Sequence, residues 1–154
     1  MTIVTNTLRS IVRSSLSKGP FLLDTMVLSE GFKSRPDESA FEWLKASSQH
    51  QITFLSVISI GEVARGIRRL EFIEKRRPER FIRWLETTLL TYDDRVLPIT
   101  VDIARYWGRI SHDLKNTNPD LLIAATALEH DLTVVTRNIR HFEATGVRLF
   151  NPYE

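Results

Sequence analysis

The chain has 154 residues, of which 42% are hydrophobic and 26% charged, and it contains no cysteine. This length suits one domain with its own core, and the absence of thiols excludes disulfide scaffolds, thiolate metal sites and thiol redox chemistry. No apolar stretch approaches the roughly 20 residues that span a bilayer, so we expect a soluble, cytoplasmic protein without membrane contact. The net charge of +2 is compatible with a polyanionic partner and decides little by itself.

Residues 1–19 differ in composition from the rest of the chain. They contain three basic residues and no acid, among many serines and threonines, and apolar residues recur at helical spacing between Leu8 and Leu16. Organelle transit peptides share this composition, and a misassigned start explains it equally well. We interpret the segment as an N-terminal extension, either helical or disordered, outside a domain formed by residues 20–154.

Short apolar runs alternate with amphipathic segments from Phe21 to the end of the chain. We expect strands at 21–23, 52–55, 95–97, 133–136 and 147–150, and helices at 27–30, 36–47, 60–72, 78–89, 100–116 and 119–130. Alternation of this kind predicts a single α/β domain with a mostly parallel sheet flanked by helices.

Three carboxylates, Asp24, Glu62 and Asp120, each lie where an apolar run meets the start of a helix. In a parallel sheet such positions gather at one edge, where ligand-binding groups meet. If the three acids converge unpaired, their repulsion requires a cation, and oxygen ligands without Cys or His partners favour Mg2+ or Mn2+ over zinc. A carboxylate cluster that holds Mg2+ is most often a site of phosphate chemistry.

Each acid also has an ordinary structural explanation. Ser59 and Glu62 have the spacing of a capping box, which is the better interpretation of Glu62 taken alone. Asp120 lies in the first turn of a helix, where the helix dipole stabilises a negative charge. Asp24 fits such a role less well, because an acid directly after a buried strand is costly unless it is paired, capped or bound to a metal.

Other functional motifs find no support in the sequence. The four histidines lack metal-ligand spacing and belong to no recognisable nucleophile motif, so we expect them to be surface or satisfied residues. The isolated glycines make no phosphate loop, which argues against a nucleotide cofactor. Eight basic residues between Arg65 and Arg83 are interleaved with three glutamates, which favours an ordinary solvated helix surface over a nucleic-acid channel.

Four segments carry a resemblance to a known family: Leu22–Glu30, Ser56–Gly66, Asp120–Ala127 with Leu132–Asn138, and Phe150–Tyr153. Taken together, the sequence resembles a PIN-domain ribonuclease, specifically the VapC-type toxins of bacterial toxin-antitoxin pairs. The resemblance implies a PIN-like fold in which Asp24, Glu62 and Asp120 hold one or two Mg2+ or Mn2+ ions, with Asn138 at a fourth site position. It further implies an endoribonuclease that cleaves RNA phosphodiester bonds and forms a homodimer. A cognate antitoxin would occlude the site from an apolar groove between the second and third expected helices.

Two positions depart from the family pattern. Met26 stands where the family usually has Asn, and a thioether cannot donate the hydrogen bonds with which an amide orients a carboxylate. Asn138 supplies a neutral oxygen where some members have a carboxylate. A catalytically weakened PIN-like module that acts by binding RNA or protein is therefore the alternative function. Arg137, beside Asn138, fits a phosphate contact and a structural salt bridge equally well.

Overall fold

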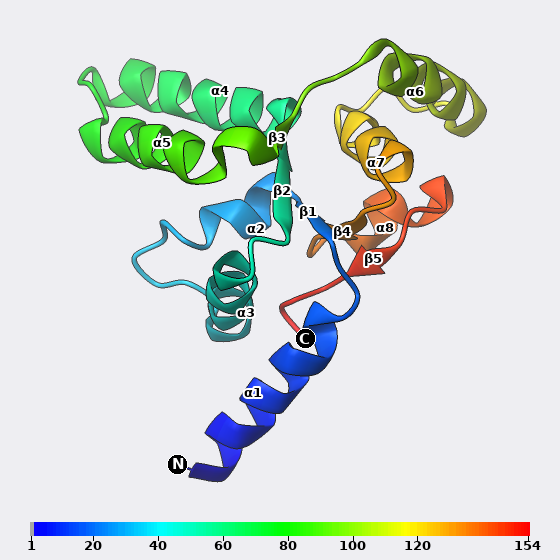
Figure 1. The fold of residues 1–154 in the computed structure, drawn as a ribbon. Coiled ribbons are helices and arrows are strands. Elements are labelled where there is room, and N and C mark those ends of the chain that lie inside the picture. The colour runs from blue at the N-terminus through cyan, green and yellow to red at the C-terminus, as the bar shows by residue number, and fades with distance from the viewer. Residues whose placement is uncertain (1) are drawn as a thin grey trace.

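The alternation of strands and helices expected from the sequence is present in the structure, a computed structural model that describes residues 2–154. A parallel sheet runs through the middle of the molecule, with strands in the order β3-β2-β1-β4-β5 (Figure 1). The strands are β1 Phe21–Leu23, β2 Thr53–Ser56, β3 Val96–Leu97, β4 Thr133–Val135 and β5 Leu149–Phe150. The predicted α/β domain with a parallel sheet is therefore confirmed.

Helices connect the strands and cover both faces of the sheet. They are α1 Thr2–Leu16, α2 Thr25–Ser29, α3 Glu38–Gln49, α4 Val57–Glu74, α5 Glu79–Tyr92, α6 Val101–Leu114, α7 Asp120–Glu129 and α8 Ile139–Phe142. Figure 1 shows α4 and α5 side by side on one side of the sheet, and α6 with α7 on the other. None of the helices within residues 2–154 combines the length and the apolar character that a membrane-spanning segment needs.

Side chains of β1 alternate between two hydrophobic cores. Phe21 and Leu23 pack with Trp43 of α3 on one face, whereas Leu22 packs with Ile123 of α7 on the other. The three β1 residues are fully buried. A strand that is buried on both faces reads as an unbroken apolar run, which explains why residues 21–23 were recognisable in the sequence.

Helix α7 is buried on most sides because it lies between the sheet and α6. Its buried residues are mostly small or aliphatic: Leu121, Ile123, Ala124, Ala125, Thr126 and Ala127. Small side chains at a helix contact allow a short interaxial distance, so α6 packs closely on α7. The first residue of α7 is thereby held firmly beside the sheet.

The starts of α3 and α4 differ from those expected. Helix α3 begins at Glu38, two residues after Pro36, because Asp37 Oδ1 accepts a hydrogen bond from Ala40 N at 3.0 Å and caps the helix. Helix α4 begins at Val57 because Ser56 Oγ accepts from Ile58 N at 3.1 Å. The capping box inferred from Ser59 is therefore wrong, since that residue lies inside α4.

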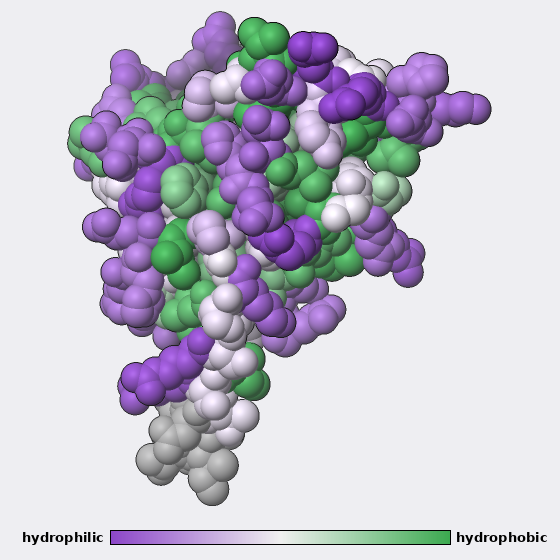
Figure 2. Space-filling view, turned by 45° about the vertical axis from the view of Figure 1, so that its right-hand side comes forward, coloured by the Kyte–Doolittle hydropathy of each residue, from purple (hydrophilic) through white to green (hydrophobic). Residues whose placement is uncertain are grey.

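The N-terminal extension is helical over Thr2–Leu16 and packs on α3 through its last turns. Trp43 Nε1 of α3 donates a hydrogen bond to Ser15 Oγ at 3.1 Å, and Val12 packs against the core that contains this tryptophan. Figure 2 shows the coloured part of α1 projecting below the body of the molecule with mostly pale, weakly polar residues on this face. The domain boundary at residues 19 and 20 stays a prediction.

Candidate functional site

Asp24 lies at the centre of the carboxyl edge of the sheet, directly after β1. Its side chain is 5% exposed, and both of its oxygens accept hydrogen bonds. Oδ1 accepts from Thr25 N at 2.8 Å, which caps α2, and Oδ2 accepts from Thr136 Oγ1 at 2.8 Å. Thr136 follows β4, the neighbouring strand. These two bonds explain how a carboxylate is tolerated at the end of a buried strand.

Glu62 lies inside α4 and reaches toward the start of α2. Thr25 Oγ1 donates a hydrogen bond to Glu62 Oε1 at 3.0 Å. Thr25 therefore connects two of the predicted site acids, donating from its backbone to Asp24 and from its hydroxyl to Glu62. The side chain of Glu62 is engaged with α2 and does not cap its own helix.

Asp120 is the first residue of α7, as expected from its setting. Its backbone N donates to Asn118 Oδ1 at 3.0 Å, so a neighbouring side chain caps the helix. The Asp120 carboxylate instead lies 3.3 Å from Nδ1 of His141, a residue of α8. No sequence motif singles out this histidine, which we expected to be an ordinary surface or satisfied residue.

Asn138 lies just after β4, two residues beyond Thr136, which donates to Asp24. Its backbone N donates to Thr136 Oγ1 at 2.9 Å, and its side-chain Nδ2 donates to Met26 Sδ at 3.4 Å. Met26 is 42% exposed, so it does not pack under the sheet as an ordinary core residue. Thr136 thus joins Asn138 to Asp24 through one hydroxyl group.

The predicted site acids lie close enough to affect one another's ionisation. Burial is the main cause that raises the pKa of Asp24, and the negative charge of Asp120 raises it further, against the hydrogen bonds from Thr136 and Thr25. Burial also raises the pKa of Glu62, with further contributions from Asp120 and Asp24. The three carboxylates therefore lie near one another, and their role as a joint site stays a prediction.

The carboxylate and amide oxygens of these residues are the kind of ligand that a hard divalent cation prefers. Among the described residues, no group of three or more His, Asp or Glu side chains is gathered as a metal site. Each carboxylate oxygen carries a further lone pair, so the hydrogen bonds from the two threonines leave room for a cation. A cation would also relieve the repulsion that adds to burial in raising the pKa values of Asp24 and Glu62.

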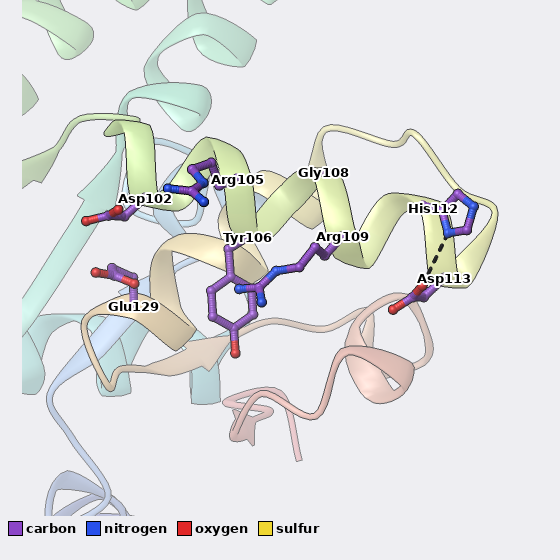
Figure 3. Close-up of a pocket in the computed structure, with 8 residues that line it drawn as sticks. All are labelled: Asp102, Arg105, Tyr106, Gly108, Arg109, His112, Asp113 and Glu129. Atoms are coloured by element: carbon purple, nitrogen blue, oxygen red, sulfur yellow. Dashed lines mark hydrogen bonds and ion pairs between the residues drawn. The ribbon is translucent and has the colours of Figure 1, made fainter.

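A cavity of about 780 Å³ opens on a different surface, along α6 and the end of α7 (Figure 3). It is lined by Asp102, Arg105, Tyr106, Gly108, Arg109, His112, Asp113 and Glu129. Arg109 lies over the Tyr106 ring, with Cζ 5.0 Å from its centroid, and His112 Nδ1 lies 3.3 Å from Asp113 Oδ1. No predicted site residue lines this cavity, so the candidate site is separate from it.

The basic run on α4 and α5 behaves as an ordinary solvated surface. Three of its members are paired with glutamates: Arg68 with Glu71 at 2.8 Å, Arg76 with Glu74 at 3.2 Å, and Arg77 with Glu79 at 3.1 Å. These contacts agree with the interpretation favoured from the interleaved charges. Arg65 differs, because its positive charge lies near enough to Glu62 to lower that residue's pKa in part.

Comparison with known proteins gives a consistent assignment. The family model of the PIN domain matches residues 21–147. VapC ribonuclease Y4jK of Sinorhizobium fredii is 33% identical over 139 residues, which cover 86% of this chain and 97% of that protein. Toxin FitB of Neisseria gonorrhoeae is 32% identical over 137 residues, with the same coverage of 86% and 97%.

Solved structures show the same similarity. The crystal structure of FitAcB from Neisseria gonorrhoeae matches with a TM-score of 0.73 at 29% identity, covering 87% of this chain and 99% of that chain. DNA-bound VapBC from Salmonella typhimurium matches with a TM-score of 0.69 at 28% identity, covering 86% and 97%. Sequence motifs, sheet topology and these similarities agree, and the chain belongs to the PIN domain family.

Proposed function

We propose that this protein is the toxin of a toxin-antitoxin pair and acts as a Mg2+- or Mn2+-dependent endoribonuclease. The observation that carries the proposal is the proximity of Asp24, Glu62 and Asp120, whose repulsion adds to the effect of burial in raising the pKa of the first two. Similar proteins named as a VapC ribonuclease and as toxin FitB support the reaction class and the biological role. RNA as substrate is consistent with action in the cytoplasm.

The residues of the site have distinct roles in this proposal. Asp24, Glu62 and Asp120 would hold the cation, and Asn138 adds a neutral amide at the same edge of the sheet. A bound Mg2+ ion activates water and stabilises negative charge on a phosphoryl group. The Thr25 and Thr136 hydroxyls hold the Glu62 and Asp24 carboxylates in fixed orientations. No side chain is required as a nucleophile.

The direct test is cleavage of RNA by the purified chain with Mg2+ and with EDTA. We expect each of Asp24→Asn, Glu62→Gln and Asp120→Asn to abolish most of the EDTA-sensitive cleavage. Asp113→Asn is the matched control, because Asp113 also lies 3.3 Å from a histidine ring but lines the separate cavity on α6. EDTA-sensitive cleavage that persists in folded variants of all three site acids would overturn the proposal.

A catalytically weakened module is the second candidate, and the contact between Met26 and Asn138 favours it. This contact places a sulfur atom where the family usually has an amide, and it occupies the side chain of the fourth site residue. RNA binding without cleavage in Mg2+ or Mn2+ would support this candidate. Cleavage that depends on the three acids would exclude it.

We further propose that a cognate antitoxin binds this chain and that the chain forms a homodimer. A pocket of about 450 Å³ lies along α3 and is lined by Gly31, Phe41, Leu44, Lys45, Ser48 and Gln49. This pocket supports α3 as one wall of the expected antitoxin groove. No residue of α4, the other expected wall, lines the pocket. Phe72 and Leu90, on α4 and α5, are 84% and 81% exposed and give further apolar area for partners.

The partner proposal is tested by co-expression with the product of a neighbouring short reading frame. We expect a stable complex with reduced cleavage, and a dimer when the chain is purified alone. A monodisperse monomer that no co-encoded small protein binds or inhibits would remove this part of the proposal.

A further inference from the structure

Arg137 stacks on an aromatic ring, a contact that its sequence position did not suggest. Its guanidinium lies over the ring of Tyr153, with Cζ 4.9 Å from the ring centroid. It forms no ion pair with any residue in the part of the chain that the structure describes. The structural salt bridge considered from the sequence is therefore absent there, and an exposed cation lies stacked beside the candidate site.

The Tyr153 ring is held in place from its far end. Its hydroxyl donates to Glu30 Oε1 at 2.9 Å, and Glu30 is only 1% exposed. Lys33 Nζ donates to the same carboxylate at 2.6 Å, and Asp37 N donates at 3.0 Å. Burial and the neighbouring Glu30 raise the pKa of Tyr153, so the phenol stays neutral and keeps the proton that it donates.

Stacking leaves the hydrogen-bonding edge of the guanidinium free. An arginine uses its flat face against an aromatic ring, whereas its five N–H donors point outward in the plane of the group. That planar edge matches the oxygens of a phosphate and binds them in pairs. Tyr153 therefore restricts the orientation of Arg137 without competing for the donors that would bind an anion.

The position of Arg137 in the chain connects it to the site acids. It stands between Thr136, whose hydroxyl donates to Asp24, and Asn138, whose backbone N donates to that same hydroxyl. The Thr136 backbone N also donates to Phe150 O at 3.0 Å, so the strand end is tied to the segment that carries Tyr153. An RNA strand with one phosphate at the acids would therefore run beside the segment that carries this guanidinium.

We propose that Arg137 binds a backbone phosphate of the RNA next to the one at the acids, and that Tyr153 is the positioning residue that orients it. This inference rests on the proposed nuclease function, since it takes RNA as the bound polymer. It assigns Arg137 to substrate binding and leaves the chemical step to the acid cluster.

Binding is measured in a Glu62→Gln background, so that a short, mixed-sequence, single-stranded RNA stays intact. Arg137→Gln should weaken binding about 10-fold, the size expected for a charge-assisted hydrogen bond. It should also reduce the slope of log affinity against log salt by about 0.7, the value for one phosphate contact on a single strand. Arg137→Lys keeps the charge but loses the planar stack, so we expect a smaller loss of affinity and an unchanged salt slope.

Two substitutions distinguish the effect of Tyr153 on Arg137 from its effect on the stability of the fold. Tyr153→Phe removes the hydrogen bond to Glu30 but keeps the ring, and it should retain most of the RNA affinity even if the unfolding midpoint falls. Tyr153→Leu removes the ring and should weaken binding nearly as much as Arg137→Gln. If both variants lose the same affinity, Tyr153 is only structural and the positioning role is wrong.

Arg109→Gln is the matched control, because Arg109 also stacks on a tyrosine, Tyr106, but on α6 (Figure 3). It should leave RNA affinity and salt slope unchanged. Equal losses from Arg109→Gln and Arg137→Gln, or none from Arg137→Gln, would overturn the assignment. In the active chain Arg137→Gln should raise KM with little change in kcat. Absence of cleavage by the unsubstituted chain, with Arg137-dependent binding intact, would instead overturn the nuclease function alone.

Discussion

The side-chain amide of Asn138 donates a hydrogen bond to the sulfur of Met26, from Nδ2 to Sδ across 3.4 Å. Thioether sulfur is a weak acceptor, so this bond holds the amide less firmly than an oxygen would. The departure from the family pattern at position 26 therefore acts on Asn138, a fourth site residue by resemblance, more directly than on Asp24. The oxygens of Asp24 are already held by Thr25 and Thr136.

Met26→Asn should raise nuclease activity or metal affinity, because an amide oxygen is a stronger acceptor for Asn138 Nδ2. Residues that orient a metal site typically change affinity or activity by about 10- to 100-fold, and we expect a gain at the lower end. Cleavage rate measured against Mg2+ concentration gives both quantities. Met26→Leu, which has no acceptor, should be no better than the parent. Equal rates and equal metal midpoints for Met26→Asn and the parent would show that the position is silent.

Glu62→Gln should abolish activity without destabilising α4. The free energy of unfolding should not fall, because a Gln oxygen still accepts from the Thr25 hydroxyl, Glu62 does not cap the helix, and a neutral side chain removes the penalty of a partly buried charge. Ser56→Ala is the comparison, since loss of the observed cap typically costs about 1 kcal/mol. Urea unfolding measures both values. A loss with Glu62→Gln as large as that with Ser56→Ala would contradict this account.

Mg2+ should raise the thermal unfolding midpoint at neutral pH, and the increase should fade on acidification. The folded-state pKa values of Asp24 and Glu62 lie above their ordinary values of 3.8 and 4.5. At pH values between the ordinary and the raised pKa, the folded protein therefore binds more protons than the unfolded protein. The penalty for ionising these groups is absent below the ordinary pKa values and complete above the raised ones, so their contribution to stability falls as pH rises. A bound cation offsets that penalty only where the groups are charged.

The measurement is thermal unfolding at several pH values, with MgCl2 and with EDTA. Asp120→Asn is the informative variant, since it removes one source of repulsion on Asp24 and Glu62. In EDTA it should gain stability relative to the parent at neutral pH and lose that advantage at acid pH. In MgCl2 its midpoint should rise less than that of the parent. A Mg2+ shift that is constant with pH and insensitive to this substitution would speak against a metal site at the acids.

Ser15→Ala should destabilise the protein through α1. It leaves the buried Trp43 indole N–H without its observed acceptor, which typically costs about 1–3 kcal/mol. Ser17→Ala is the matched control, because Ser17 makes the same kind of bond to a backbone oxygen three residues earlier but is exposed. Urea unfolding followed by tryptophan fluorescence measures both. Equal midpoints for the two variants would show that α1 adds little to the core.

Much of the sheet could be predicted because its strands are short apolar runs between polar turns. Residues 21–23 agree with β1 since burial on both faces leaves no polar position in the strand. The place of Asp24 at the carboxyl edge of the sheet was also predictable, because this residue directly follows β1. The start of α4 could not be predicted, because Ser56 and Ser59 are both residue types that cap helices well. Ser56 is the cap because β2 ends at this residue. The roles of the acids stay predictions.

The supporting residues of the site could not be predicted from local patterns. The Thr25 hydroxyl meets Glu62 over 37 residues of chain, and the Thr136 hydroxyl meets Asp24 over 112. Short threonine side chains beside strand ends are common, and nothing in their neighbours indicates such partners. The contact between His141 and Asp120 could not be predicted either, because α8 has only four residues, too few to show a helical period.

The pairing of β1 with β4 also has a kinetic meaning. These strands meet only after more than a hundred intervening residues have been brought into place, and contacts of such long range form slowly because loop-closure entropy is lost before they contribute. Asp24 obtains its Thr136 partner in that same event. Until β1 and β4 have paired, Asp24 lacks the hydroxyl that holds its second oxygen, so the final orientation of this carboxylate depends on long-range contacts that form slowly.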